Sequence, residues 1–225
     1  MNRATKRAAA ALVLGTLAGP LLAAGGHHAV DDARILDEGR CKLEGWAGRT
    51  GAPSRLVHAG AGCRVGPVEL AAGSDYERQG GGAGSTTDNG LLAKWAREVG
   101  GGASVGLSVA PQWQARARPR HQGTTVVGLL TWEPREAVAL HANVGRDLVR
   151  GGPDESRAGV SIDWTFREGW LVMAERFRQE GGHFARAGLR WTPSKDWTVD
   201  VSRAVRLRGA GESAWIVALT REFDR

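Results

Sequence analysis

The sequence predicts an all-β fold: an antiparallel transmembrane β-barrel, twelve strands in number. Three observations predict it. Apolar and polar residues alternate along many segments of about 10–12 residues, the connections between these segments alternate in length, and tryptophans gather near the short connections. Such segments are roughly twice as long as a usual soluble strand and match a tilted strand that crosses a membrane.

Residues 1–24 predict a secretory signal peptide, with a basic start that includes Arg3 and Lys6 and an apolar stretch from Ala8 to Ala24. The alternative is an uncleaved anchor helix, but the apolar stretch contains Pro20 and is short for a span of about 20 residues. Residues 25–40 are then a short periplasmic N-terminal segment, and residues 41–225 are the outer-membrane barrel.

The composition is compatible with this export. The 225 residues carry a formal charge of +6, and the loss of three basic residues with the leader halves it. A hydrophobic fraction of 42% excludes a disordered chain, and 33 glycines without a three-residue period exclude collagen. An exported chain with so small a charge is a poor fit for nucleic-acid binding.

Two cysteines predict a disulfide in the first hairpin. If strands at 41–50 and 54–64 turn at Gly51-Ala52-Pro53, Cys41 lies directly opposite Cys63. Directly opposed residues of a non-hydrogen-bonded pair approach to about 4.5 Å between Cα atoms, which suits a disulfide. Redox and zinc roles are less favoured, because no other soft ligands cluster near the pair.

The alternation continues along the chain. The expected strands cover 41–50, 54–64, 67–76, 89–99, 103–113, 124–133, 136–146, 157–167, 170–179, 183–192, 197–207 and 213–223. Connections after even-numbered strands are short, whereas 77–88, 114–123 and 147–155 are longer. Short periplasmic turns and longer external loops produce this asymmetry, and twelve is an even number, as bacterial barrels require.

Aromatic residues near strand ends predict an interfacial girdle. The candidates are Trp132, Trp164, Trp170, Trp191, Trp197, Trp215 and Phe223. Amphipathic rings of this kind belong at the boundary between lipid and water. The alternative is the core of a soluble sandwich or lipocalin-like barrel, which would place more tryptophans in mid-strand than Trp46 and Trp95.

The rows opposite the apolar ones should line the lumen. The candidates are Lys94, Glu98, His141, Asn143, Ser161, Asp163, Glu175, Arg186, Arg190, Asp200 and Arg206. These charges either tune passage through a water-filled pore or pair across a narrow interior and close it. A barrel of twelve strands lies between the filled eight-stranded and the open sixteen-stranded kinds, so its width alone does not decide.

An enzyme is not expected. His141 faces Ser161 if their hairpin turns near residue 151, and Asp163 is close in sequence, but no nucleophile-elbow motif is present. No cofactor is expected, and no metal beyond a weak hypothesis of Cu(II) or Ni(II) at a new terminus Gly25-Gly26-His27. The glycine run 80–84 predicts a flexible external loop. The basic run 116–121 predicts a solvated loop, with lipopolysaccharide phosphates as a less favoured partner.

One stretch resembles a known family. His27-His28, Asp31-Asp32 and the strand Cys41-Lys42-Leu43-Glu44 resemble proteobacterial outer-membrane proteins of the putative MetA-pathway of phenol degradation family, although Ala29 and Val30 replace its Pro and Thr. The resemblance implies an outer-membrane barrel associated with transport of aromatic compounds. We therefore expect a narrow channel or transporter for small solutes, hydrophobic or aromatic by resemblance. A non-conducting structural or adhesive barrel is the alternative, and a barrel enzyme comes third.

Overall fold

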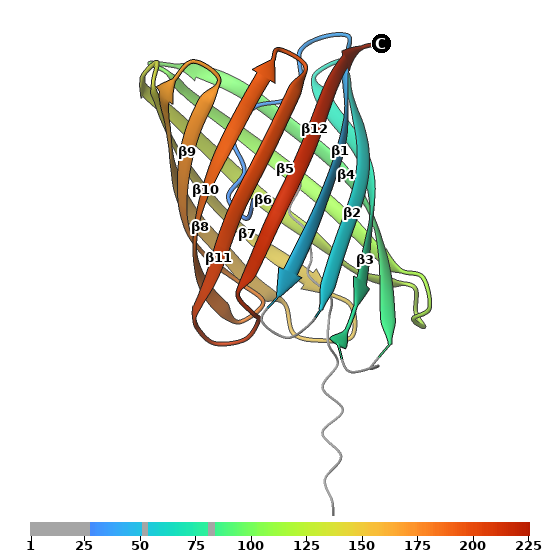
Figure 1. The fold of residues 1–225 in the computed structure, drawn as a ribbon. Coiled ribbons are helices and arrows are strands. Elements are labelled where there is room, and N and C mark those ends of the chain that lie inside the picture. Colours follow the sequence, from blue (N-terminus) through green and yellow to red (C-terminus); the bar gives the residue numbers. More distant parts are fainter. Residues whose placement is uncertain (1–27, 51–53, 81–83) are drawn as a thin grey trace, which may run out of the picture.

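The computed structural model describes residues 28–50, 54–80 and 84–225, and these form a closed barrel of twelve antiparallel strands (Figure 1). The strands are β1 (Arg40–Thr50), β2 (Arg55–Val65), β3 (Val68–Arg78), β4 (Ser85–Gly100), β5 (Ala103–Gln114), β6 (His121–Arg135), β7 (Val138–Val149), β8 (Glu155–Arg167), β9 (Trp170–Gln179), β10 (Gly182–Ser194), β11 (Trp197–Arg208) and β12 (Ala214–Asp224). Each pairs with its neighbours in sequence, and β1 pairs with β12 to close the barrel. The predicted fold class is confirmed.

The barrel is apolar outside and polar inside, the reverse of a soluble protein. Val144 and Val217 in outward rows are 69% and 53% exposed, whereas Thr131 and Asp147 in inward rows are at most 1% exposed. Strand alternation produces this sorting, because successive side chains point to opposite faces of a sheet. The surrounding solvent that fits such an exterior is lipid. No helix among the described residues is long and apolar enough to cross a membrane, a finding that concerns helices alone and does not bear on a β-barrel.

The two ends of the barrel differ. Tight turns lie at the end where β1 begins and β12 ends, and the longer connections lie at the other (Figure 1). The tight turns use glycines such as Gly66 and Gly169, whose φ angles of +59° and +72° favour a residue without a Cβ. At this short-turn end the Arg225 amide donates to the Gly39 carbonyl at 2.8 Å, which ties the C-terminus to the start of β1.

The disulfide prediction is confirmed together with its register. Cys41 lies directly opposite Cys63 across the β1–β2 ladder, and the two form a disulfide with a Cα–Cα distance of 4.0 Å. It lies one residue inside the start of β1, close to the C-terminal strand, because Cys41 is also opposite Phe223. The bond therefore cross-links β1 to β2 next to the β1–β12 closure of the barrel.

Strand lengths differ from the predicted ones at the end with longer connections. Residues 77–88 were expected to form a loop, but β3 runs to Arg78 and β4 begins at Ser85. The β-branched Thr86 and Thr87 lie opposite Glu77 and Tyr76, so the ladder extends beyond the expected apolar stretch. Side-chain hydropathy did not reveal these residues as strand because polar residues can pair where a barrel leaves the lipid.

Candidate functional site

Residues 28–39 are called the lumen segment below; residues 28–36 lie inside the barrel, and residues 37–39 form an exposed turn at its short-turn end (Figure 1). The sequence predicted a periplasmic segment at 25–40. In the structure, the described part of this stretch extends from the short-turn end into the interior, where it contacts inward-facing side chains of several strands. The predicted signal peptide and the Gly25-Gly26-His27 metal hypothesis lie outside the described residues.

Glu175 of β9 is the first anchor of the lumen segment. Its carboxylate accepts hydrogen bonds from the backbone amides of Ala29 and Val30, both at 3.1 Å, and lies 3.0 Å from His28 Nδ1. Arg186 of β10 pairs with the same carboxylate at 3.3 Å. Two backbone donors of the segment are thus satisfied by a charged acceptor, the stronger kind of hydrogen bond.

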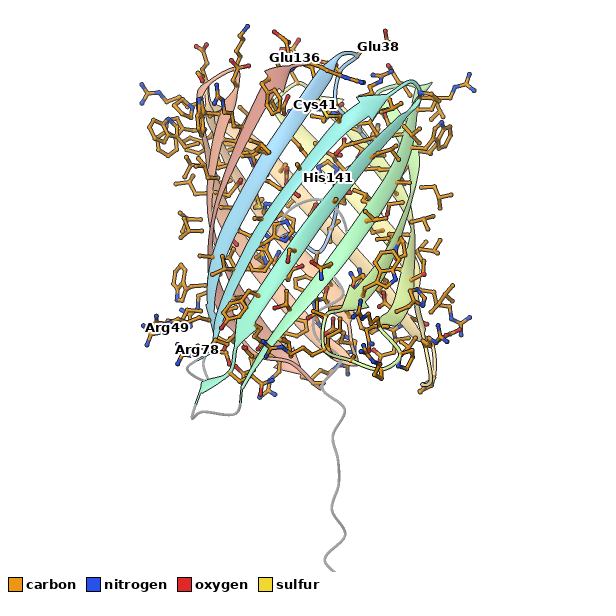
Figure 2. All side chains as sticks on the ribbon, turned by 90° about the vertical axis from the view of Figure 1, so that its right-hand side faces the viewer. Glu38, Cys41, Arg49, Arg78, Glu136 and His141 are labelled. Atoms are coloured by element: carbon orange, nitrogen blue, oxygen red, sulfur yellow. A yellow bond between two sulfur atoms is a disulfide. The ribbon has the colours of Figure 1, made fainter. Side chains whose placement is uncertain are left out.

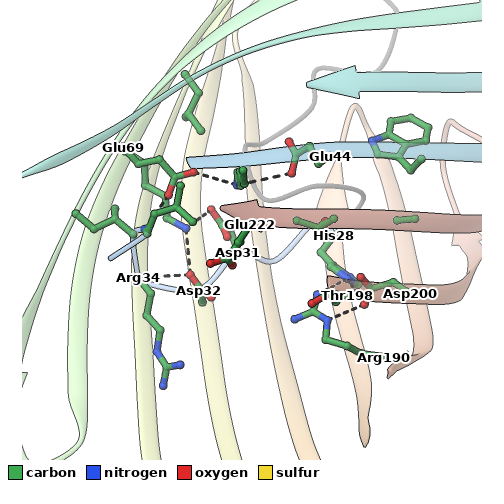
Figure 3. Close-up of a pocket in the computed structure, with 18 of the residues that line it drawn as sticks. His28, Asp31, Asp32, Arg34, Glu44, Glu69, Arg190, Thr198, Asp200 and Glu222 are labelled. Atoms are coloured by element: carbon green, nitrogen blue, oxygen red, sulfur yellow. Dashed lines mark hydrogen bonds and ion pairs between the residues drawn. The ribbon is translucent and has the colours of Figure 1, made fainter. Parts of the chain in front are cut away.

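Lys94 of β4 is the second anchor. Its ammonium lies 2.8 Å from Asp31 Oδ2 and 3.1 Å from Asp32 Oδ1 (Figure 3). The amide of Asn143, oriented to suit its neighbours, donates to the Asp31 carbonyl at 2.9 Å and accepts from the Asp31 amide at 2.7 Å. One cation therefore serves two carboxylates, and the backbone between them is held by an amide side chain.

Further contacts continue toward β1. The Ala33 amide donates to Thr131 Oγ1 at 2.8 Å, and the Leu36 amide donates to Glu69 Oε2 at 3.1 Å. Arg64 donates to the Leu36 carbonyl at 3.1 Å. Arg34 forms an ion pair with Glu133. An extended chain in a buried place needs partners for its own amides and carbonyls, and the barrel wall supplies them.

Two small apolar clusters complete the docking. Val30 is 6% exposed and packs against Phe177 and Phe184, while Ala33 packs against Val127 and Leu129. The fit at Val30 depends on Gly159, where an added Cβ would lie 2.5 Å from the Val30 side chain.

The charges of the lumen segment respond to this environment. Burial lowers the pKa of His28, but its hydrogen bonds with Asp200 and Glu175 outweigh burial and leave that pKa above its usual 6.5. Burial raises the pKa of Asp31 to about 6, despite the attraction of Lys94. Burial acts in the same direction on Asp32, but the nearby Lys94 ammonium holds the pKa of Asp32 below its usual value.

A second charged network lines the wall beside the segment. Lys42 lies 3.0 Å from Glu69 and 3.6 Å from Glu44, and His58 bridges Glu44 and Asp75 at 3.7 and 2.8 Å. The ring of Trp46 stacks on His58 with 5.4 Å between centroids, so this tryptophan is buried in the lumen.

Two cavities flank the lumen segment. One of about 390 Å³ lies between the segment and the wall that includes Lys42, Glu69 and Thr198. The other, of about 280 Å³, lies between the segment and the wall that includes Glu133, Asp163 and the β9 side chains. The lining of both is mainly charged or polar, so the segment divides a hydrophilic interior rather than a packed apolar core.

The predicted lumen-lining residues fall into three groups. Those that contact the lumen segment directly are Lys94, Asn143, Glu175, Arg190 and Asp200. Those that line its surroundings are His141, Ser161, Asp163 and Arg186. Glu98 and Arg206 lie in exposed positions near strand ends, away from the segment.

Sequence reasoning missed several residues that hold the segment or form an ion pair with a residue that holds it. Lys42, Glu69, Thr131 and Glu133 all occupy inward-facing positions of their strands. The alternation could have found them, since Glu69 shares its row with Ala71 and Gly73, opposite Leu70 and Ala72.

The possible catalytic arrangement is incomplete in the described residues. His141 does lie opposite Ser161, as the register argument predicted. However, His141 Nδ1 bonds to Thr131 Oγ1 at 2.8 Å and Nε2 lies 3.7 Å from Asp163, and no hydrogen bond joins His141 to Ser161. The described residues also contain no group of three or more His, Cys, Asp or Glu side chains arranged to hold a metal.

The predicted girdle residues lie in outward rows. Exposed rings among them are Trp132, Trp164, Trp191, Trp197, Trp215 and Phe223, and Trp170 stacks on Trp191 with 5.7 Å between centroids. Trp215 is near the start of β12, at the end with longer connections, whereas Trp132, Trp170 and Trp191 are near tight turns.

Residues 12–221 match the model of a protein family described as "Uncharacterised conserved protein UCP029691". The chain belongs to this family. The match does not support the resemblance to the phenol-degradation family that the N-terminal residues suggested. No curated protein matches the sequence.

Solved structures with a similar fold are outer-membrane proteins. The KdgM porin superposes with a TM-score of 0.67 at 10% identity, over 81% of this chain and 99% of that one. The NanC porin gives 0.62 at 8% identity, over 80% and 98%. The P. putida toluene transporter TodX gives 0.55 at 8% identity, over 84% and 91%. At such identities the likeness concerns the fold, which is that of outer-membrane porins and transporters.

Proposed function

We propose that this chain is an outer-membrane channel for small solutes whose lumen is narrowed by its own N-terminal segment. The observation that carries the proposal is the pair of hydrophilic cavities, of about 390 and 280 Å³, that flank residues 28–39. A structural plug would gain most from dry, complete packing, whereas polar cavities of this size hold water. Movement of one short segment would join the two cavities into one path.

The charged and polar lining favours polar solutes over aromatic ones. Two neighbouring folds are described as a porin in complex with disordered oligogalacturonate and as a toluene transporter, so this type of barrel is compatible with either class. The inward rows here carry Lys42, Glu44 and Asp200 rather than an apolar lining. The aromatic solutes implied by the family resemblance are therefore the second choice.

A non-conducting barrel is the alternative, and the lumen segment itself favours it. Glu175, Lys94 and Glu69 hold the segment at three places, and a segment that never leaves would keep the barrel closed. The same contacts thus serve either a gate or a permanent plug, and the difference lies in how often they open.

Conductance in planar lipid bilayers tests the proposal. We compare the wild-type protein with a variant that lacks residues 28–37, which leaves the disulfide and all twelve strands in place. A channel narrowed by the segment gives small or intermittent steps in the wild type and larger, steadier steps in the deletion variant. Absence of discrete steps from both proteins would refute the channel and leave the structural role. Panels of polar and aromatic solutes in liposome swelling then rank the solute classes.

The membrane partners follow from the same orientation. Short turns face the periplasm and longer connections face the exterior, so the tryptophans near tight turns would lie at the periplasmic interface. Arg116, Arg118 and Arg120 belong to an external connection between β5 and β6 and are not buried, as expected for a solvated loop.

A further inference from the structure

Carboxylates are confined to one face of the barrel wall, whereas arginines occur on both. On the described strands every carboxylate occupies an inward-facing row, as the burial alternation of each strand shows. The charged residues of the outward rows are Arg49, Arg55, Arg78, Arg97, Arg146, Arg176, Arg178, Arg203 and Arg221. Figure 2 shows Arg49 and Arg78 at the end of the barrel opposite to Cys41.

Three of these arginines surround one strand of small residues. Arg178 and Arg176 of β9 lie opposite His183 and Ala185 of β10, and Arg203 of β11 lies opposite Ala187. The outward row of β10 therefore presents two alanines between the longer side chains of its neighbours. The two alanines therefore have an arginine on each neighbouring strand, in the part of the barrel closer to the external end.

The outward arginines beside β10 differ from the inward arginines in their ion pairs. The inward-facing Arg157, Arg186 and Arg190 each pair with a carboxylate of the barrel wall. Among the residues that the structure describes, no such ion pair forms with Arg176, Arg178 or Arg203.

Two of the three are nevertheless held in place by neutral groups. Arg176 donates to the Phe184 carbonyl at 2.8 Å, and the Arg203 guanidinium lies 5.3 Å from the centre of the Trp215 ring. An arginine that faces lipid destabilises a barrel most at the bilayer midplane and much less near the interface. An anion supplied by the membrane would remove this cost.

An apolar groove begins beside Arg176. This cavity of about 540 Å³ lies on the outward face and crosses β6 to β9. Ala142 and Ala174 are its small residues, and larger side chains border them, namely Leu130, Trp132, Leu140, Val160 and Ile162. A depression between branched side chains suits a hydrocarbon chain, and its end at Arg176 places the polar end of that chain beside the arginines.

We propose that Arg176, Arg178 and Arg203, together with this groove, bind a phosphate-bearing lipid of the outer leaflet, namely lipopolysaccharide. Guanidinium groups bind phosphate oxygens in bidentate fashion, and the three arginines around the β10 alanines present several such donors to one headgroup. One acyl chain then lies in the groove between Leu140 and Ile162. The site does not depend on whether the lumen conducts.

Native mass spectrometry of the folded barrel in detergent tests this proposal, with diphosphoryl lipid A and phosphatidylcholine as probes. The wild type should bind lipid A at least tenfold more tightly than phosphatidylcholine. The double variant Arg176→Gln, Arg203→Gln should lose at least tenfold in affinity for lipid A. Ala174→Phe should also weaken lipid A binding, because the larger side chain fills the groove.

Arg97→Gln is the matched control, because Arg97 also faces outward but lies toward the short-turn end of β4. It should bind lipid A within twofold of the wild type. Heat-modifiable mobility on gels establishes that each variant is folded before it is compared. Equal affinity for the two lipids, an unaffected double variant, or an equal loss in the Arg97 control would each overturn the site.

Discussion

Replacement of Lys94 by methionine should release the lumen segment, and the release should depend steeply on pH. Lys94 is the cation that faces Asp31 and Asp32, at 2.8 and 3.1 Å. Methionine keeps much of the side-chain length without the charge. Docked Asp31 then lies buried without its partner, and its pKa rises above the value of about 6 that it has beside Lys94.

The size of the effect follows from proton linkage. In the variant, docked Asp31 stays protonated and so avoids a buried unpaired charge. The docking free energy lost through Asp31 therefore cannot exceed the cost of keeping this carboxyl protonated. Because the pKa of docked wild-type Asp31 is about 6, this cost is roughly 1.4 kcal/mol at pH 7 and roughly 2.7 kcal/mol at pH 8. The half-exposed Asp32 adds at most about 1 kcal/mol, because solvent screens its ion pair.

The direction of the pH dependence of docking follows from this linkage. The variant's docked state holds a proton that the wild-type docked state has lost, so its docking weakens relative to the wild type as pH rises above 6. We expect the part of the docking defect that arises from Asp31 to be small at pH 5 and to rise to about tenfold at pH 7 and about a hundredfold at pH 8. Loss of the Asp32 ion pair adds at most about fivefold at each of these pH values.

A thiol reporter measures this docking. Ala33 is 2% exposed, and Ala33→Cys adds only one atom to a residue that is covered when the segment is docked. The rate of labelling by a water-soluble maleimide, compared at the same pH with and without the Lys94→Met substitution, gives the ratio of undocked populations. Adding Asp31→Asn should remove the pH dependence of that ratio. A ratio that stays constant from pH 6 to pH 8 would refute the assigned role of the Lys94–Asp31 pair.

Three further predictions concern the same segment and the disulfide of the first hairpin. Gly159→Ala should raise Ala33→Cys labelling, since its Cβ would lie 2.5 Å from Val30, while Gly128→Ala, whose Cβ would have no contact closer than 3.6 Å, should leave labelling unchanged. His28→Gln should weaken docking below pH 6.5, and the effect should shrink as pH rises through the elevated pKa of His28. The reason is that stability from a raised histidine pKa is present at low pH and lost at high pH. Equal labelling of the proteins with and without this substitution at pH 6 would contradict the prediction. Replacing Cys41 and Cys63 by serine should lower barrel stability by about 3 kcal/mol, seen as a lower temperature of the heat-modifiable gel shift. An unchanged transition would show that the β1–β2 hydrogen-bond ladder holds the first hairpin without the disulfide.

Much of the barrel could be predicted because strand alternation and hairpin pairing depend on residues that are close together in the sequence. In β11, Val199 and Val201 alternate with Asp200 and Ser202, and the structure exposes the first pair more than the second. The opposition of His141 and Ser161 also follows from one turn position, since an antiparallel hairpin has a single pairing sum. Both arguments use neighbours along the chain.

The lumen segment could not be predicted because its partners are remote and its own pattern is weak. His28 bonds to Glu175, 147 residues away, and Ala33 bonds to Thr131, 98 residues away. No periodicity marks residues 28–39, which form neither strand nor helix. The inward position of Trp46 could not be predicted for a related reason. An apolar ring is unexpected in a polar inward row, and its stacking partner there, His58, is identified only by the structure.

In the proposed gate, the charge pairs of the lumen wall would let this segment leave as well as bind. When it undocks, Glu175 keeps Arg186 at 3.3 Å, Asp200 keeps Arg190 at 2.7 Å, and Glu69 keeps Lys42 at 3.0 Å. The anchoring carboxylates are therefore not left as isolated buried charges, the state that would cost most. Three residues hold the segment, namely Glu175, Lys94 and Glu69. Of these, only Lys94 has its described ion pairs solely with the segment, and water from the joined cavities can reach its ammonium. Docked and undocked states thus both satisfy most of their charges, which is the condition for two populated states and for a gate rather than a permanent plug.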